Sequence, residues 1–326
     1  HPLNASQRAR AVISQADVIL GLEVNDLWGQ LNSQSDRVHR QSRQVTKAGA
    51  KIITISNKDM YSKSNFQDSA RFQEADISIA GDGESSLPLL TEYVKKALTA
   101  DRRSAFEERG KKLNAARLQV VNAAMAEATI GWDSSPLTTA RVAAELYAQI
   151  KDDDWSLVGN AIRFNWPFRL WNVTKRHQWN GGSGGAGIGY NCPGALGGAL
   201  FNKGKGRISV AVQGDGDFMF VPSTLWTAAH HRIPILYVMH NNRAYHQEYM
   251  YLQAMAGRRG RGAENAHIGT TLIDPNVDYA TVARGMGIYG EGPITDPKDL
   301  GPALKRALAV VRRGEPALVD VVTDPR

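Results

Sequence analysis

The stretch "GDGDFMFVPSTLWTAAHHRIPILYVMHNN" (residues 214–242) places polar turns directly after two apolar runs. Asp215 lies between two glycines at the end of the run 207–214, and an asparagine pair follows the run 233–240. The 24 residues between the second glycine and the pair suffice for one helical crossover between parallel strands. If the two strands are neighbours in a parallel sheet, both turns lie at the same edge of that sheet.

These two turns carry oxygen ligands and a backbone suited to phosphate. The Asp215 carboxylate and the Asn242 amide oxygen, completed by backbone carbonyls and water, form the hard-oxygen set that Mg²⁺ prefers when it bridges phosphates. Gly214 and Gly216 have no Cβ, so the chain can turn sharply and bring its N–H groups close to an anion. An Asp-Gly turn or a helix-capping Asn pair would be ordinary alone, but together at crossover spacing they favour a metal–phosphate site.

Apolar runs alternate with helical patterns along the whole chain. The first part contains three such runs, at residues 16–23, 50–56 and 75–81. The second part contains four, at residues 155–160, 207–214, 233–240 and 316–322. Buried strands separated by helices are typical of parallel sheets covered by helices on both faces. The sequence therefore predicts an α/β protein with two doubly wound parallel-sheet domains.

The boundaries of these domains follow from a polar, helix-favouring segment between them. We predict a Rossmann-like domain at residues 1–105, a linker at 106–135 and a second domain at 136–326. Within the linker, Ser134 or Ser135 is predicted to cap a helix that begins near Pro136. Because the chain has no initiator Met and starts at once with a helix-then-strand pattern, we expect it to be the middle of a longer protein.

Composition and charge exclude several classes of protein. The 326 residues carry a net charge of +7, but the basic residues are dispersed, and the densest cluster, "GRRGRG" (257–262), lacks interleaved aromatics. A nucleic-acid partner is therefore not predicted. No apolar stretch reaches the roughly 18–20 residues that span a bilayer, so no membrane partner is predicted either. Cys192 is the single cysteine, which excludes an intrachain disulfide and favours a cytoplasmic location.

A nicotinamide dehydrogenase is also disfavoured. The first predicted strand is not followed by G-x-G-x-x-G, the dinucleotide fingerprint. The glycine-rich "GGSGGAGIG" (181–189) follows a polar, basic segment rather than the strand which that fingerprint requires.

The pair GDG and NN resembles the signature of thiamine-diphosphate enzymes. The upstream block "GGAGIGYNCPGALGGAL" (184–200) is similar to the G-x-G-x-x-x-P-A-A-x-G element of the same enzymes. The resemblance extends over the whole chain, as a Rossmann-like central domain followed by a thiamine-diphosphate-binding domain. This is the layout of the acetolactate synthase, pyruvate decarboxylase and benzoylformate decarboxylase group.

The resemblance implies thiamine diphosphate and Mg²⁺ as cofactors and assigns residues to each. Mg²⁺ would bind Asp215, Asn242 and the backbone carbonyl of Ala244. The expected cofactor-binding residues are Ala186, Ile188, Gly214, Asp215, Gly216, Asp217, Asn242, Ala244 and Tyr245.

Within this set, the backbone and one bulky side chain have separate roles. The N–H groups of Gly216 and Asp217 would bind the diphosphate, and Ile188 would wedge the cofactor into its bent shape. The carbonyl of Ala186 and the N–H of Ile188 would hold the aminopyrimidine ring. Asp217 stands where the family often has serine, so we expect its side chain to point away from the phosphates or to cap a helix.

The resemblance also suggests catalytic residues. Glu248 stands where pyruvate decarboxylase-like enzymes carry a glutamate that assists decarboxylation and protonates the product. If it is buried near the diphosphate, its pKa would be raised, as suits a general acid; the alternative is a solvated glutamate on a helix. His246 is a weaker candidate for contact with substrate. The predicted function is a thiamine-diphosphate- and Mg²⁺-dependent 2-oxo acid decarboxylase or C–C lyase, with an acetolactate synthase-like carboligase or a non-catalytic subunit as alternatives.

The expected partners follow from the same resemblance. The substrate would be a small 2-oxo acid or related carbonyl compound. The family's activating glutamate lies in a pyrimidine-binding domain that these 326 residues do not contain. We therefore expect a homo-oligomer, a dimer or a tetramer, or a complex with a chain that carries this domain.

Overall fold

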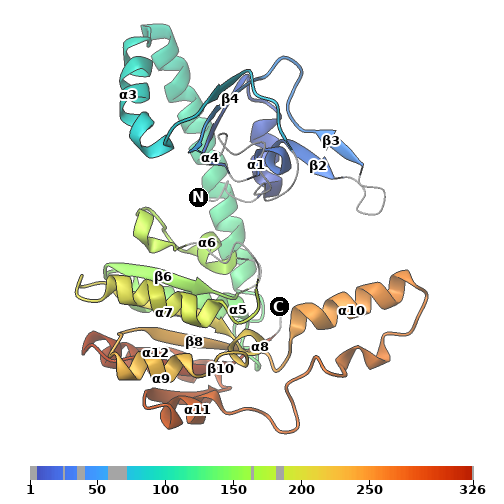
Figure 1. Cartoon of the computed structure of the whole chain (residues 1–326), viewed down its shortest axis with the longest axis vertical. Coiled ribbons are helices and arrows are strands. Elements are labelled where there is room, and N and C mark those ends of the chain that lie inside the picture. The colour runs from blue at the N-terminus through green and yellow to red at the C-terminus, as the bar shows by residue number, and fades with distance from the viewer. Residues whose placement is uncertain are drawn as a thin grey trace. The chain divides into compact units, whose positions relative to one another are not determined.

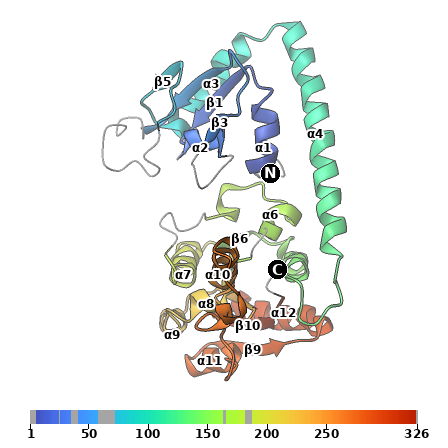
Figure 2. The same ribbon diagram turned by 90° about the vertical axis from the view of Figure 1, so that its right-hand side faces the viewer.

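The structure, a computed structural model, describes residues 6–24, 26–34, 41–57, 72–162, 165–180 and 187–324. The chain divides into two compact units, residues 1–120 and 121–326. Each unit contains a parallel β-sheet flanked by helices (Figure 1, Figure 2). The predicted α/β fold class is therefore confirmed.

The first unit is built on a three-stranded parallel sheet whose strands coincide with the three predicted runs. In the order β1-β4-β5, they are β1 (Val18–Leu22), β4 (Lys51–Ile55) and β5 (Ile77–Ile79). The described helices are α1 (Ser6–Ile13), α2 (Leu27–Leu31) and α3 (Gly83–Lys96). An antiparallel pair, β2 (Asn32–Gln34) with β3 (Ser42–Gln44), was not predicted, because its residues are polar and lack an apolar run.

A carboxylate joins the carboxyl ends of the strands in this sheet. Glu23, which follows β1, accepts hydrogen bonds from the Gly83 N–H (2.9 Å) and from the Ser56 hydroxyl (3.3 Å). Asp82 caps the same helix, α3, by accepting from the Ser85 N–H (2.7 Å). A phosphate at this helix start would have to compete with two carboxylates that the chain itself supplies.

The segment predicted as a linker is largely helical. Helix α4 (Ala100–Ala128) is continuous over 29 residues, and the division between the units falls inside it, between Val120 and Val121. Its charged side chains are mostly exposed, which explains the polar composition that marked it as a linker.

The helix after α4 begins later than predicted. In α5 (Thr139–Ile150) the cap is Thr138, whose hydroxyl accepts from the Arg141 N–H (3.2 Å). The prediction of a cap at Ser134 or Ser135 is therefore wrong. Leu137 forms a parallel β-bridge with Thr323, and this pairing keeps the backbone extended up to the cap.

The second unit contains a five-stranded, fully parallel sheet with the order β6-β7-β8-β10-β9. Its strands are β6 (Trp155–Asn160), β7 (Ile208–Gly214), β8 (Leu236–Asn241), β9 (Tyr289–Ile294) and β10 (Ala317–Val322). Four of them come from predicted runs. The sequence analysis missed β9 because "YGEGPI" contains two glycines and a proline, which disfavour strands. This strand lies at the edge of the sheet, where a proline is tolerated.

Helices cover both faces of this sheet, and alternate strand residues enter different cores. In β8, Leu236 and Val238 pack in one core, whereas Tyr237 and Met239 pack in the other. The first core includes α5 and α12 (Pro297–Arg312). The second core includes α7 (Asn191–Asn202), α9 (Thr224–His230) and α11 (Tyr279–Gly285). The other described helices are α6 (Trp166–Leu170), η4 (Arg176–Gln178), α8 (Asp215–Phe218), α10 (His246–Arg258) and η5 (Glu264–His267).

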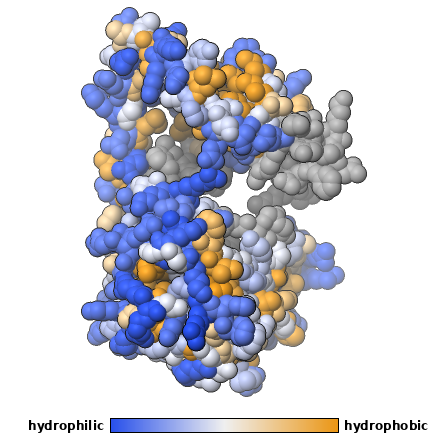
Figure 3. Space-filling model, turned by 60° about the vertical axis from the view of Figure 1, so that its left-hand side comes forward, coloured by the Kyte–Doolittle hydropathy of each residue, from blue (hydrophilic) through white to orange (hydrophobic). Residues whose placement is uncertain are grey.

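Large hydrophobic side chains also lie on the surface. Figure 3 shows hydrophobic patches among hydrophilic residues. On α7 and α9 of the second unit, Leu200, Phe201 and Trp226 are 55%, 68% and 55% exposed. These three side chains lie on helices that contact one another, α7 and α9.

A charged cluster holds the amino ends of β6 and β7. The Asp154 carboxylate accepts hydrogen bonds from Lys175 (3.1 Å), His177 (2.8 Å) and Arg207 (3.1 Å). Burial acts to raise the pKa of Asp154, but the hydrogen bonds from these three residues outweigh it and lower the pKa to about 2.

This lowered pKa predicts a pH-dependent contribution to stability. An Asp whose pKa is depressed on folding stabilises the protein above its unfolded pKa of about 4, and that contribution is lost as the pH falls toward 2. Because the side chain is 34% exposed, Asp154→Asn should reduce the free energy of unfolding at pH 7 by only about 1 kcal/mol. The difference from wild type should shrink between pH 4 and pH 2, as measured by urea unfolding.

The exposed neighbour Asp152 provides the matched control. Asp152→Asn should leave the free energy of unfolding close to that of wild type over the same pH range. An equal loss in both variants, or a loss at Asp154 that does not change with pH, would contradict the assignment.

Candidate active site

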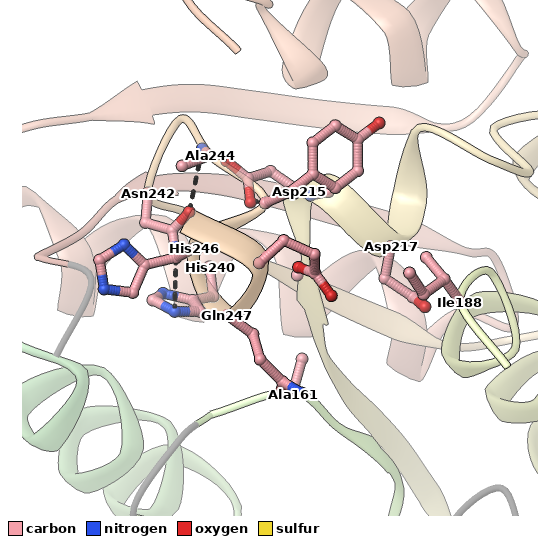
Figure 4. Close-up of a pocket in the computed structure, with 13 residues that line it drawn as sticks. Ala161, Ile188, Asp215, Asp217, His240, Asn242, Ala244, His246 and Gln247 are labelled. Carbon is pink, nitrogen blue, oxygen red and sulfur yellow. Dashed lines mark hydrogen bonds between the residues drawn. The ribbon is translucent and has the colours of Figure 1, made fainter. Parts of the chain in front are cut away.

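The two polar turns meet at one edge of the second sheet, as predicted. Strands β7 and β8 pair in parallel, with Gly214 opposite His240. A cavity of about 300 Å³ lies at this edge (Figure 4). Its lining comprises Ala161, Ile188, Gly214, Asp215, Gly216, Asp217, His240, Asn242, Ala244, Tyr245, His246, Gln247 and Glu248. Every predicted site residue in the described part of the chain is in this set, whereas Ala186 lies outside the described residues.

Asp215 is the buried anionic group of the site. Its side chain is 1% exposed, and its oxygens accept hydrogen bonds from the N–H groups of Gly216 (2.8 Å) and Ala244 (3.3 Å). Burial raises the pKa of Asp215 to about 7, although these backbone N–H groups act to lower it. A buried carboxylate of this kind is stabilised in its charged form by a cation placed beside it.

Asn242 presents its amide oxygen to the same place. Its Oδ1 accepts from the Ala244 N–H (3.1 Å), the group that also donates to Asp215. The carboxylate and amide oxygens are thus both within 3.3 Å of one nitrogen (Figure 4). The backbone just beyond is fixed by the Tyr245 N–H, which donates to the Thr270 carbonyl (2.8 Å).

His240 and Thr323, to which no sequence pattern pointed, continue the hydrogen bonding of the Asn242 amide, whose oxygen is placed by the Ala244 N–H. His240 is 5% exposed, with Nε2 3.3 Å from Asn242 Nδ2 and Nδ1 2.5 Å from Thr323 Oγ1. Because an amide nitrogen only donates, Nε2 accepts, and Nδ1 carries the proton that it donates to Thr323. Burial, together with the charge of His246, lowers the pKa of His240 to about 4, so its imidazole is neutral.

The other member of the asparagine pair faces away from the cavity. Asn241 donates to Asp320 Oδ1 (3.0 Å), and Asp320 Oδ2 accepts from the Tyr279 N–H (3.2 Å) at the start of α11. Burial raises the pKa of Asp320 to about 6. Asn241 therefore joins β8 to β10 and α11, while Asn242 faces the cavity.

Gly216 allows the two turns to close on one another. A Cβ at this position would lie 2.7 Å from Cδ1 of Tyr245, which is closer than a Cβ atom approaches a ring carbon in proteins. The Tyr245 ring in turn packs edge-on against Phe220, with ring centroids 6.0 Å apart. Glycine is thus required here for the close approach of Tyr245.

The Asp217 side chain caps a helix, but not its own. Its carboxylate accepts from the N–H groups of Gly189 (2.5 Å) and Asn191 (3.2 Å), at the start of α7 rather than of α8. The side chain thus caps a helix, as one of the two expectations had it, but the helix is α7 rather than the one that follows Asp217. The contact predicted between its own N–H and a diphosphate remains a prediction.

The remaining candidates line the cavity from two helix starts. Ile188 is 51% exposed in the turn before α7, and His246 is the half-buried first residue of α10. Glu248, in the first turn of α10, is exposed, so the burial that would raise its pKa is not seen in this chain. Ile188 and Glu248 also line an adjoining cavity of about 710 Å³.

The described residues contain no group of three or more His, Cys, Asp and Glu side chains that could hold a metal ion. In the same part of the chain, every helix is too short or too polar to cross a bilayer.

The chain is similar to known proteins of one family. Residues 158–321 match the family described as thiamine pyrophosphate enzyme, C-terminal TPP binding domain. An acetolactate synthase large subunit of Mycobacterium tuberculosis is 30% identical over 197 residues, 59% of this chain and 32% of that protein. A benzoylformate decarboxylase of Pseudomonas aeruginosa is 30% identical over 137 residues, 42% of this chain and 23% of that protein.

A solved structure shares the fold over nearly the whole chain. It is a thiamine diphosphate-dependent 4-hydroxybenzoylformate decarboxylase of Rhodococcus jostii, 18% identical, with a TM-score of 0.63. The similarity covers 98% of this chain and 51% of that one. The chain thus spans about half the length of this structure and a third or less of the length of the two relatives above. The matched family region covers half of the chain and contains both polar turns, and the chain belongs to the thiamine pyrophosphate enzyme family.

Proposed function

We propose that the chain binds thiamine diphosphate through Mg²⁺ at the carboxyl edge of the second sheet, as part of a 2-oxo acid decarboxylase or C–C lyase. The convergence of the Asp215 and Asn242 oxygens on the Ala244 N–H carries this proposal. Thiamine pyrophosphate is the cofactor of the family to which the chain belongs, and the metal and the reaction are our inference.

The donor set fits a magnesium ion that bridges phosphates. Asp215 supplies a buried carboxylate whose raised pKa favours a neighbouring cation, and Asn242 supplies an amide oxygen held in place by His240. The Ala244 carbonyl would complete the protein ligands, with phosphate and water oxygens filling the remaining positions. The N–H groups of Gly216 and Asp217 would face the diphosphate.

Side chains from α10 and from the turn before α7 would act on the reacting part of the cofactor. Bound thiamine diphosphate supplies a carbon nucleophile and an electron sink for carbonyl chemistry. Ile188 projects into both cavities and would support the cofactor's bent shape. Glu248 and His246 both line the first cavity; Glu248 would donate a proton to the product, and His246 would contact the substrate.

A carboligase of the acetolactate synthase type is the second candidate. The adjoining cavity of about 710 Å³ shares Ile188 and Glu248 with the first and offers room for a second carbonyl compound. The similarity to an acetolactate synthase large subunit supports this alternative.

The proposed working unit contains more than one chain. Exposed Leu200, Phe201 and Trp226 suit contact with another copy of the chain or with a chain that carries a pyrimidine-binding domain. A cytoplasmic location, inferred from the single cysteine, belongs to the same proposal.

The first test concerns binding. Thiamine diphosphate with Mg²⁺ should raise the melting temperature of the wild-type chain, because a ligand at one hundred times its Kd adds about 2.7 kcal/mol to the free energy of unfolding. Asp215→Ala should abolish this rise, since it removes the carboxylate that would hold the metal. Differential scanning fluorimetry with and without both ligands measures the effect.

Asp278→Ala provides the matched control. Asp278 caps α11 by accepting from the Thr281 N–H (2.8 Å), and it lines neither cavity. The variant should melt at a lower temperature than wild type but show the full rise with cofactor. An undiminished rise in Asp215→Ala would contradict the proposed metal site.

The second test concerns the reaction. The full-length protein with cofactor and a panel of 2-oxo acids should release carbon dioxide and aldehyde. Glu248→Gln should slow aldehyde release by about 10²–10⁴-fold, the usual effect of removing a general acid, and should spare ligation to a second carbonyl compound.

The exposed Glu315, just before β10, offers a control of the same chemistry, and Glu315→Gln should behave as wild type. Hydroxy-ketone as the main wild-type product would favour the carboligase. Absence of turnover with every 2-oxo acid would contradict both enzymatic candidates and favour the alternative of a non-catalytic subunit.

A further inference from the structure

Asp217 connects two parts of the cavity wall that are separate in the sequence. It belongs to α8, whose first residue is Asp215. Its Oδ1 accepts from the Gly189 N–H (2.5 Å), and its Oδ2 accepts from the Asn191 N–H (3.2 Å). One side chain thus joins the turn expected to bind diphosphate to the turn that carries Ile188.

A buried glutamine holds the Asp217 carboxylate in this position. Gln213, at the end of β7, is 0% exposed, and its Nε2 donates to Asp217 Oδ2 (3.0 Å). Its Oε1 accepts from Asn191 Nδ2 (2.7 Å), which also donates to the Val212 carbonyl (3.1 Å). Asp217, Gln213 and Asn191 therefore form a closed network anchored in the sheet.

The turn before α7 depends on this network for its shape. The Tyr190 N–H donates to the Gly187 carbonyl (3.3 Å), and Gly189 has φ +91°, a value that glycine adopts without strain. The Gly189 N–H belongs to the peptide immediately after Ile188. Since the Ile188 side chain is 51% exposed, its direction is set mainly by this peptide rather than by packing.

Charge alone predicts a different role for Asp217. A second carboxylate near a diphosphate would repel it and weaken binding. At the start of α7, a helix of 12 residues, the carboxylate instead lies where the helix dipole and two N–H groups stabilise negative charge.

We infer that Asp217 is a positioning residue that fixes the Ile188 turn against the diphosphate-binding turn, so that cofactor affinity depends on it through Ile188. The inference rests on the proposed binding of thiamine diphosphate. It assigns to the Asp217 side chain a role in orienting the cofactor rather than in contacting it.

A double-mutant cycle tests this dependence. Asp217→Ala should weaken thiamine diphosphate binding about tenfold at fixed Mg²⁺, by isothermal titration of the chain. In an Ile188→Ala background the same change should have less than about a twofold effect, because residues that act as one unit are not additive. Asp217→Asn retains one acceptor oxygen and should give an intermediate loss.

Two results would overturn the inference. Tighter binding by both Asp217→Ala and Asp217→Asn would show that the charge opposes the diphosphate. An equal loss with and without Ile188 would show that Asp217 acts independently of the turn. The control is Asp296→Ala. Asp296 caps α12 by accepting from the Lys298 N–H (2.9 Å), and its removal should leave the Kd for thiamine diphosphate within about twofold of wild type.

Hydrogen exchange of the cofactor-free chain tests the contact itself. The Gly189 and Asn191 amides should exchange at least about tenfold faster in Asp217→Ala than in wild type or Asp296→Ala. Unchanged exchange would overturn the inference. If wild type fails to bind thiamine diphosphate, the proposed function is contradicted, while this measurement still decides whether Asp217 holds the turn.

Discussion

The burial of the Asp215 carboxylate is the constraint that shapes the rest of the site. Removing a carboxylate from water is unfavourable unless hydrogen bonds or a cation compensate. Two backbone N–H groups compensate in part, and burial still raises the pKa of Asp215 to about 7, so a neighbouring cation would stabilise the charged form. The surrounding residues can be understood as supports for such a cation.

Those supports extend well beyond the cavity lining. Asn242 could present either its oxygen or its nitrogen, and only the oxygen can bind a metal. The Ala244 N–H and the neutral imidazole of His240 both favour the orientation with the oxygen inward. Asn241, the preceding residue, joins β8 to Asp320 of β10. The asparagine pair thus divides into one proposed metal ligand, Asn242, and one structural residue, Asn241.

The sequence predicted the parts of this site that follow from local patterns. Continuous apolar runs marked β7 and β8 as buried parallel strands, and that alone placed Asp215 beside Asn242. His240 and Thr323 could not be paired in this way, because they are 83 residues apart and their contact depends on the register of β8 with β10.

Other differences between the sequence-based predictions and the structure also have local causes. The edge strand β9 lacks the apolar composition on which strand prediction depends. Of the two environments considered for Glu248, the structure has the solvated one, because α10 has no buried residue and its first turn is open to solvent. Asp217 was expected to turn from the phosphates or cap a helix, and only the fold identifies α7 as that helix.

The hydrogen bond between His240 and Thr323 makes the site sensitive to changes in the residues just after β10. Thr323 also donates its N–H to the Asn241 carbonyl (3.0 Å). The residue just past β10 is therefore hydrogen-bonded to the backbone of the asparagine pair. A truncation that removes Thr323, or a bulky fusion attached directly after β10, would break these hydrogen bonds of Thr323 to Asn241 and His240. If Asn242 holds a metal as proposed, such a change would weaken metal binding as well as loosen the residues after β10.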